Sequence, residues 1–501
     1  MTTREATAAR QGLGLAAASF LGLMVAAALA FLPLKAALAG AVGIAAAAVA
    51  MFRPEYGLGI FFAMIVFISD TGEGIPGRTL TIFDPDPPGL PPATVSFLLF
   101  LALLTFFRRV MLERRKSLVS PWGLLAFAGI IALGWLTGRA GGWPVEDLQT
   151  DSTRWIYPLL CFFVCANILD SYQHIGRFLV ILFAACAAKA ALLLAFFAAG
   201  RGFIYESYTI VSRDSAELMA FSVMLFLAMA LLGTGRVRGR MRVFLVLGSL
   251  PMLGALVFAF RRSHWLGLVL GGLLLWRWSD RVARERFMRY ALLGLALAIP
   301  LALMAAVYGE RGLSGELARI GARFTTFFDT RQHSNLHHKL EAWYTLQDLL
   351  ERPVQGLGIG SRHTPVPSAL VGGWLEENQP TEIVHNSFLY VWMKLGLPGL
   401  LFMLWLGFDT LRRLGRYWRE VPDSPARPLV AGLAAVFGVW LPMFMSGAVF
   451  SYPHQSYLLV LFTVLIRNLV ALELRRAALE GRAFSEPVPE GAETLSGARI
   501  G

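Results

Sequence analysis

Charged residues are scarce in this chain. Asp, Glu, Lys and Arg make up 16% of its 501 residues, whereas soluble domains contain about 25%. Hydrophobic residues make up 56%, and apolar runs of about 18 residues or more recur along the whole sequence. Each such run is long enough to cross a bilayer as an α-helix. The composition therefore excludes an ordinary soluble domain and predicts an all-α, polytopic membrane protein whose first partner is the lipid bilayer.

Cysteine is nearly absent as well. The three cysteines, Cys161, Cys165 and Cys186, all lie inside apolar runs, where cysteine behaves as a small buried hydrophobic residue. This pattern excludes a disulfide framework and a cysteine metal site.

Acidic metal-binding motifs are also lacking. The sequence "DPD" at 84–86 has the form Asp-x-Asp, but it lies in a proline-rich turn. One long loop contains several histidines, namely His333, His337, His338 and His363. They have no regular spacing and no evident acidic partner, so the sequence predicts neither a metal site nor a cofactor.

Positive charge is the one kind of charge in excess. Lys and Arg total 45 against 33 Asp and Glu, which gives a formal net charge of +12. Most of the basic residues fall in short segments between apolar runs, where positive charge fixes the orientation of a membrane protein. We therefore interpret the charge as a topology signal and predict no nucleic-acid partner.

The apolar runs predict about fourteen spans, given the roughly 20 residues that a spanning helix needs. Arg4 and Arg10 precede the first run as in a signal peptide, but that run leads directly into a second one, which favours a retained span. The predicted spans lie near 13–33, 36–52, 56–69, 93–107, 121–138, 155–170, 175–199, 215–233, 243–260, 264–278, 290–308, 386–408, 429–448 and 455–471.

The positive-inside rule orients these spans. With the N-terminus inside, all of the strongly basic segments fall on the cytoplasmic side, and so does the C-terminus. These segments are 108–116, 236–242, 277–289, 412–419 and 467–482. The same topology places outside the membrane the segments 70–92, 139–154, 200–214 and 309–385.

The outer segment 309–385 is too long to be a simple connector. Within it, "LHHKLEAWYTLQDLLERP" has apolar residues at helical spacing, from Leu336 to Leu350, and Pro353 is expected to end that helix. We predict short helices that lie over the outer membrane face and cover a cleft at the level of the lipid. The glycines of "GLGIGS" that follow are interpreted as turn residues, because no strand–loop–helix pattern surrounds them.

Three polar residues far apart in the sequence are predicted at one outer membrane level. Arg213 and Arg262 lie at the outer starts of two spans, and His385 lies at the outer start of a third. Two guanidinium groups can bind a diphosphate by bidentate hydrogen bonds. A neutral histidine at a helix N-terminus can accept a proton from a hydroxyl group. The alternative is that the arginines are interfacial anchors and the histidine is a capping residue.

Lys189 is a further polar candidate, because it lies in the middle of the seventh predicted span. A lysine at that depth is either paired inside the helix bundle or extended toward the interface. Asp214 and Glu217 are candidate partners.

Three motifs in one block carry a family resemblance. Arg-x-x-Trp opens a span at Arg262–Trp265, "WYTLQDLLERPVQGLGIGS" follows in the outer loop, and "HNSFLYVWMKLGLPGLLF" begins the next span. In this order, the block at 255–408 resembles the O-antigen ligase and O-antigen polymerase superfamily of bacterial envelope glycosyltransferases. Arg213 also resembles an outer-face arginine of that family.

The resemblance adds supporting candidates and departures. Asn386 follows His385 in the last motif. Lys339 stands where family members commonly have an arginine, and it keeps the charge but loses the bidentate geometry. His264 replaces part of a glycine-rich segment near Arg262.

The resemblance implies a metal-independent transfer reaction at the periplasmic face of the bacterial inner membrane. The diphosphate of an undecaprenyl-diphosphate-linked glycan would bind Arg213 and Arg262, and His385 would deprotonate an acceptor hydroxyl. Single displacement would invert the anomeric carbon. The acceptor is lipid A–core or a similar glycolipid for a ligase of lipopolysaccharide biosynthesis. It is another lipid-linked repeat unit for an O-antigen or exopolysaccharide polymerase.

A transporter or flippase is the alternative from another class, but it places charge near the membrane midplane. The predicted organisation has four parts: N-terminal spans at 1–260, the ligase/polymerase-like core at 261–408, C-terminal spans at 409–475, and a polar cytoplasmic tail at 476–501 that is predicted to be disordered.

Overall fold

The structure is a computed structural model of the chain. It describes residues 43, 45–67, 93–112, 121–198, 213–232, 239–257, 259, 261–279, 281–282, 284–289, 333–367, 370, 382–421, 424, 426–447, 449–451 and 453–480. These residues form helices and connecting turns, with no β-strand among them, so the all-α prediction is confirmed there. The predicted spans at 13–33 and 290–308, part of the span at 36–52, the outer segment at 70–92 and the tail beyond 480 lie outside the described residues.

Most predicted spans correspond to a helix. The helices before the long outer segment are α3 (Pro54–Phe67), α4 (Ala93–Phe106), α5 (Pro121–Ala140), α6 (Val145–Ile168), α7 (Tyr172–Ala198), α8 (Arg213–Leu232), α9 (Gly239–Val257) and α10 (Arg262–Trp278). The later helices are α13 (His333–Glu351), α14 (Ser387–Glu420), α15 (Arg427–Ser446) and α16 (Pro453–Leu479). A π-helical turn at Phe107–Leu112 continues α4, and a 3-10 turn at Val449–Ser451 lies between α15 and α16.

Six helices among the described residues are long and apolar enough to cross a membrane by length and composition. They are Trp122–Ala140, Tyr172–Ala195, Gly239–Val257, Ser387–Glu420, Arg427–Ser446 and Gln455–Leu479. Pro54–Phe67 and Ala216–Leu232 are apolar but shorter. The chain is therefore a membrane protein, whereas the number of about fourteen spans and their orientation stay predictions.

Two helices extend beyond the predicted spans. The outer segment expected over 139–154 is mostly helix, because α5 ends at Ala140 and α6 begins at Val145. Hydropathy did not reveal the first turns of α6, since they are polar, although Glu146 and Asp147 there suit the positive end of a helix dipole. The basic segment 412–419 is likewise not a loop but the end of α14.

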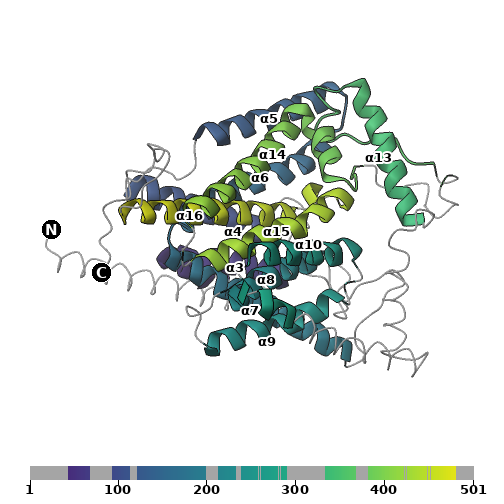
Figure 1. Cartoon of the computed structure of the whole chain (residues 1–501). Coiled ribbons are helices and arrows are strands. Elements are labelled where there is room, and N and C mark those ends of the chain that lie inside the picture. Colours follow the sequence, from purple (N-terminus) through teal and green to yellow (C-terminus); the bar gives the residue numbers. More distant parts are fainter. Residues whose placement is uncertain are drawn as a thin grey trace, which may run out of the picture.

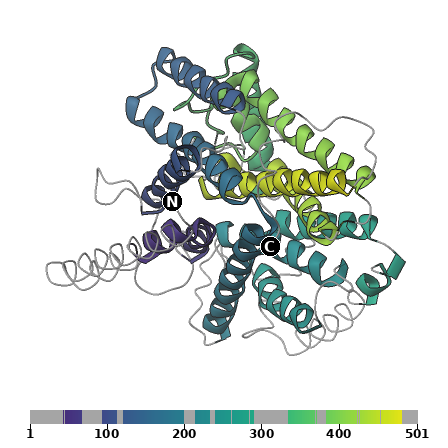
Figure 2. The same ribbon diagram turned by 90° about the vertical axis from the view of Figure 1, so that its left-hand side faces the viewer.

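The helices pack around two hydrophobic cores. The larger core includes side chains of α3, α8, α15 and α16, with the rings of Phe221 and Trp440 stacked at 5.0 Å. The smaller core joins α5, α6 and α14, and Trp155 stacks there on Tyr390. Figure 1 shows α13 at one end of the assembly, running across the direction of α15 and α16. Figure 2 shows α5 and α14 together at one side, apart from α7 and α9.

Close backbone contact fixes α10 against α15. A Cβ atom added at Gly438 would lie 2.8 Å from the backbone nitrogen of Gly271, and one at Gly271 would lie 2.8 Å from the carbonyl oxygen of Ala435. Small residues at such crossings let membrane helices approach closely. This packing sets the position of α10, the helix that begins with Arg262.

Helix α14 is broken at Gly396, where φ is 69°. A Cβ atom there would lie 2.5 Å from the carbonyl oxygen of Val354, so a side chain has no room. The backbone N–H of the next residue, Leu397, donates a hydrogen bond of 2.9 Å to that same oxygen. The break therefore joins α14 to the loop that follows α13, and the motif "LGLPG" marks it in the sequence.

Candidate functional site

His385 lies directly before α14, as the sequence predicts. Asn386 is the N-cap, and its side-chain oxygen accepts hydrogen bonds from the backbone N–H groups of Phe388 (3.1 Å) and Leu389 (3.2 Å). The Ser387 hydroxyl donates to the carbonyl of Gly447 at 2.7 Å. These contacts satisfy backbone groups at the helix start and fix its position. Asn386 therefore stabilises the helix that presents His385.

The Glu341 carboxylate of α13 contacts both the backbone N–H and the imidazole ring of His385. One carboxylate oxygen accepts the backbone N–H of His385 at 2.9 Å, and both oxygens lie 3.1 Å from Nδ1. Because an ionised carboxylate only accepts hydrogen bonds, Nδ1 must carry the proton. The other ring nitrogen, Nε2, is then the basic one. The His385 side chain is 33% exposed and Glu341 only 3%, so the pair lies at the edge of the protein interior.

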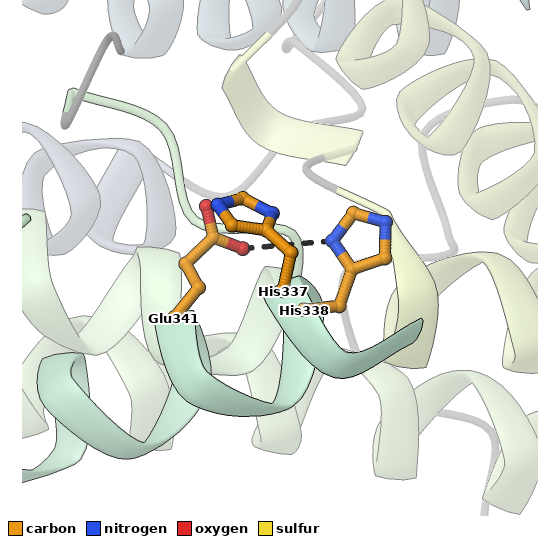
Figure 3. A group of neighbouring side chains, drawn as sticks. All are labelled: His337, His338 and Glu341. Carbon is orange, nitrogen blue, oxygen red and sulfur yellow. Dashed lines mark ion pairs between the residues drawn. The ribbon is translucent and has the colours of Figure 1, made fainter. Parts of the chain in front are cut away.

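Three more histidines surround the same carboxylate. His338 Nδ1 lies 3.8 Å from Glu341 Oε2, and His363 Nε2 lies 3.8 Å from Oε1. The His338 ring is 4.5 Å from the His385 ring, and the His337 ring is 6.4 Å from it. Figure 3 shows His337, His338 and Glu341 extending from the same side of α13. We call these five residues the Glu341 cluster.

Burial and the neighbouring imidazoles set the protonation of Glu341 and His337. Burial alone raises the pKa of Glu341, but the adjoining imidazoles of His338 and His385 lower it more, so this pKa lies well below its usual value. Glu341 is therefore a carboxylate at neutral pH. Burial lowers the pKa of His337, which favours its neutral imidazole form.

The buried face of α13 is polar. Its residues at four-residue spacing, His337, Glu341, Thr345 and Leu349, are all buried, whereas Trp343 and Leu350 of the apolar series are exposed. The predicted helix and its end before Pro353 are confirmed. Exposed apolar side chains suit a helix that lies on a membrane surface, and the role of α13 as a cover over a cleft stays a prediction.

A buried ion pair positions the loop after α13. Lys394 Nζ of α14 lies 2.5 Å from the carboxylate of Asp151 and donates a hydrogen bond of 2.6 Å to the carbonyl of Ser361. The same carboxylate accepts the backbone N–H of Gly360 at 2.9 Å. Gly360 has a φ of 78°, so the prediction that this segment makes turns is confirmed. His363 follows this anchored turn.

The arginines lie at the predicted helix starts. Arg262 begins α10, and His264 in the same turn is buried. Arg213 begins α8, but its side chain lies outside the described residues. The meeting of both arginines with His385 at one diphosphate therefore stays a prediction.

The two lysine candidates differ. Lys189 is 1% exposed and donates to the carbonyl of Phe67 at 3.4 Å, so of the two alternatives the buried one is confirmed. Lys339 is exposed on α13, unlike its buried neighbours His337 and Glu341. Neither position supports a direct catalytic role.

Sequence reasoning missed Glu341, Asp151 and Lys394. The signal for Glu341 was present in "HHKLE", because residues three and four apart share one helix face. Lys394 lies inside a predicted span, where a charged side chain points to a buried partner, but only Lys189 was noticed. The partner, Asp151, lies in the polar start of α6 that hydropathy did not identify.

An apolar groove of about 330 Å³ runs between α5, α6, α14 and α16. Its walls include Phe127, Trp155 and Phe402, while Asp409 and Arg413 line it further along α14 from His385. The groove offers an apolar surface along α14, the helix that begins just after His385.

The block that contains the three sequence motifs matches a known protein family. Residues 247–404 match the family model described as O-antigen ligase. This block is similar to an O-antigen ligase domain. It contains α10, α13, the whole Glu341 cluster and the first half of α14, and it confirms the resemblance found in the motifs. The match supports membrane glycosyl transfer of the O-antigen ligase and polymerase type. None of the curated proteins matches the chain.

Proposed function

We propose that the O-antigen ligase domain transfers a glycan from an undecaprenyl-diphosphate carrier to an acceptor hydroxyl at the periplasmic face of the bacterial inner membrane. The acceptor is lipid A–core or a similar glycolipid. The observation that carries this proposal is the contact between Glu341 and His385, because it leaves Nε2 of a partly exposed histidine as a free base.

The reaction is a single displacement. Nε2 of His385 accepts the proton of the acceptor hydroxyl as that oxygen attacks the anomeric carbon. The bond from that carbon to the diphosphate oxygen breaks, and undecaprenyl diphosphate leaves with the electron pair. Attack on the face opposite the leaving group inverts the anomeric carbon.

Glu341 and Asn386 position the base in this scheme. The carboxylate holds Nδ1–H and so fixes the tautomer and the direction of the ring. The capped start of α14 fixes the backbone of the same residue. Arg213 and Arg262 are assigned to the diphosphate, where guanidinium groups stabilise the negative charge that develops on the leaving group. The apolar groove suits a prenyl or acyl chain.

The second candidate function is polymerisation, in which the acceptor belongs to another lipid-linked repeat unit. The same base and the same diphosphate contacts serve both reactions, so the acceptor distinguishes them.

Envelope glycolipids from a strain without this gene test the proposal. We expect gels to show lipid A–core without attached long glycan, while the glycan remains on its undecaprenyl carrier, and the intact gene to restore the ladder. Core capped by a single repeat unit would instead indicate a polymerase. An unchanged ladder without exopolysaccharide would indicate a polymerase of a separate pathway.

The Arg262→Lys variant is expected to lose nearly as much activity as Arg262→Ala. Lysine keeps the charge, but it lacks the two parallel N–H groups that bind a diphosphate in bidentate geometry. The measurement is the initial rate of glycan transfer in membranes containing equal amounts of each variant. A wild-type rate for Arg262→Lys would mean that this residue is an interfacial anchor.

A further inference from the structure

The Glu341 cluster contains more histidines than the proposed reaction requires. His385 as the base and Glu341 as the residue that positions it would be enough. Besides His385, three histidines face one carboxylate. In the part of the chain that the structure describes, His338 Nδ1 and His363 Nε2 are buried and have no hydrogen-bond partner. Buried polar atoms are normally hydrogen-bonded. Each of these two nitrogens lies 3.8 Å from a carboxylate oxygen of Glu341, so imidazole nitrogens and a carboxylate, which are ligand types of divalent cations, face one another here.

His363 has one ring nitrogen bound to the backbone and the other facing Glu341. Its side chain is 4% exposed, and Nδ1 lies 2.8 Å from the carbonyl oxygen of Thr364. A carbonyl can only accept, so Nδ1 carries the proton and Nε2 of the neutral ring carries a lone pair. That nitrogen lies 3.8 Å from Glu341 Oε1, which is too long for a hydrogen bond. Histidines that bind a metal through one ring nitrogen almost always donate the other ring N–H to a backbone carbonyl, a carboxylate or water, and His363 meets that requirement.

The donor geometry suits a small divalent cation. The ligand atoms of His337, His338 and Glu341 all lie within 4.8 Å of one another, and all three extend from one side of α13 (Figure 3). Zn–N and Zn–O bonds of about 2.0–2.2 Å place tetrahedral ligand atoms about 3.3 Å apart. Side-chain rotations can make up this difference. Two imidazoles and one carboxylate favour Zn²⁺ or Co²⁺ over Mg²⁺ or Ca²⁺, which prefer oxygen ligands.

We propose that His337, His338 and Glu341 bind a first-row divalent cation of the Zn²⁺ type, with His363 or water as the fourth ligand, and that the bound ion inhibits glycan transfer. The inhibition rests on the proposed function. The ion binds the carboxylate that holds His385 Nδ1 at 3.1 Å, and His385 then loses the contact that orients its ring. Catalysis itself remains metal-independent.

Co²⁺ binding tests the site without any assay of activity. The full chain, purified in detergent with a tag that contains no histidine, is stripped with EDTA and titrated with Co²⁺, whose visible absorption reports tetrahedral coordination. We expect one Co²⁺ per chain, displaced by Zn²⁺. The His337→Gln/His338→Gln double variant is expected to bind Co²⁺ at least about 100-fold more weakly, because even outer contacts of metal sites contribute about 10–100-fold.

Two further variants guard against an effect on folding. His338→Gln alone alters only the less buried of the two imidazoles and is expected to weaken binding while the chain elutes as wild type in gel filtration. His174→Gln is the matched control, since His174 pairs with Asp170 at the start of α7, and it is expected to bind as wild type. Absence of the Co²⁺ absorption in the wild type, or equal absorption in the double variant, would overturn the site.

Transfer rates test the inhibition separately. With Zn²⁺ bound, we expect transfer to fall about 10–150-fold relative to EDTA-treated protein, the factor for losing a hydrogen bond to a charged group. EDTA alone is expected to leave activity intact or raise it. An ion that binds without slowing transfer would disprove the inhibition and leave the site standing. Transfer that is absent in both conditions would contradict the proposed function, while the Co²⁺ titration still decides the site.

Discussion

The His385→Ala variant is expected to transfer glycan about 10²–10⁴-fold more slowly than the wild type, because a positioned general base contributes about that factor. The loss should appear in kcat. The variant is expected to remain folded in the membrane, since the His385 side chain is one-third exposed and the Asn386 cap does not depend on it. The measurement is the initial transfer rate from lipid-linked glycan to acceptor at saturating donor, per amount of protein.

Added imidazole separates a chemical role from a structural one. It is expected to restore part of the rate of His385→Ala, because a free base can occupy the space left by the side chain. The matched control is His174→Ala at the start of α7, which is expected to keep the wild-type rate. A wild-type rate for His385→Ala would end the assignment of this residue as the base.

Glu341 should act only through His385. In Glu341→Gln the amide oxygen still accepts Nδ1–H, but the negative charge is lost. Hydrogen bonds to charged groups contribute about 1.5–3 kcal/mol, which corresponds to a factor of about 10–150 in rate. The double variant His385→Ala/Glu341→Gln is expected to be no slower than His385→Ala alone, because the two residues form one unit. A further loss in the double variant would show that Glu341 has an independent role.

The sequence predicted the positions of the helices well because a membrane helix leaves a long apolar run. It failed at α6, whose first turns are polar, and at the end of α14, where basic residues continue the helix. In both places the helix extends beyond the apolar run. The break at Gly396 was also not predicted. The glycine of "LGLPG" allows it, but the close approach of the loop at Val354 that requires it is a tertiary contact.

Of the contact between His385 and Glu341, the sequence predicted only His385. His385 was found because it stands at the edge of an apolar run, beside a recognisable motif. Glu341 lies in a helix that was identified from its apolar residues, yet α13 buries its polar face and exposes Trp343. Which face of such a helix meets the protein depends on the tertiary contact to His385, 44 residues away. For the same reason the sequence did not reveal Glu341 as the acidic partner of the histidines, and no metal site was predicted.

The Asp151→Asn variant is expected to lose about 3–5 kcal/mol of stability, the usual effect of removing one member of a buried ion pair. The Lys394 side chain is fully buried, so its ammonium would lose the negative charge of the carboxylate beside it and keep the Ser361 carbonyl and the Tyr390 ring, which are uncharged. Lys394→Met should be milder, because Asp151 retains the Arg154 guanidinium at 2.6 Å and the Gly360 N–H. The measurement is the thermal midpoint for loss of the monodisperse peak in detergent.

The double variant Asp151→Asn/Lys394→Met decides whether charge or shape is responsible. It leaves no buried ammonium without a counterion, so it should be more stable than Asp151→Asn despite carrying an additional substitution. Asp409→Asn on α14 is the matched control: its pair with Arg413 is partly exposed and contributes only about 0.3–0.5 kcal/mol. If the double variant is the least stable of all, the pair acts through packing and Asp151 does not balance the charge of Lys394. If it recovers, the loss in Asp151→Asn comes from the buried Lys394 ammonium without its counterion, and not from the loss of the contacts to Gly360 and Ser361 in the loop before His363.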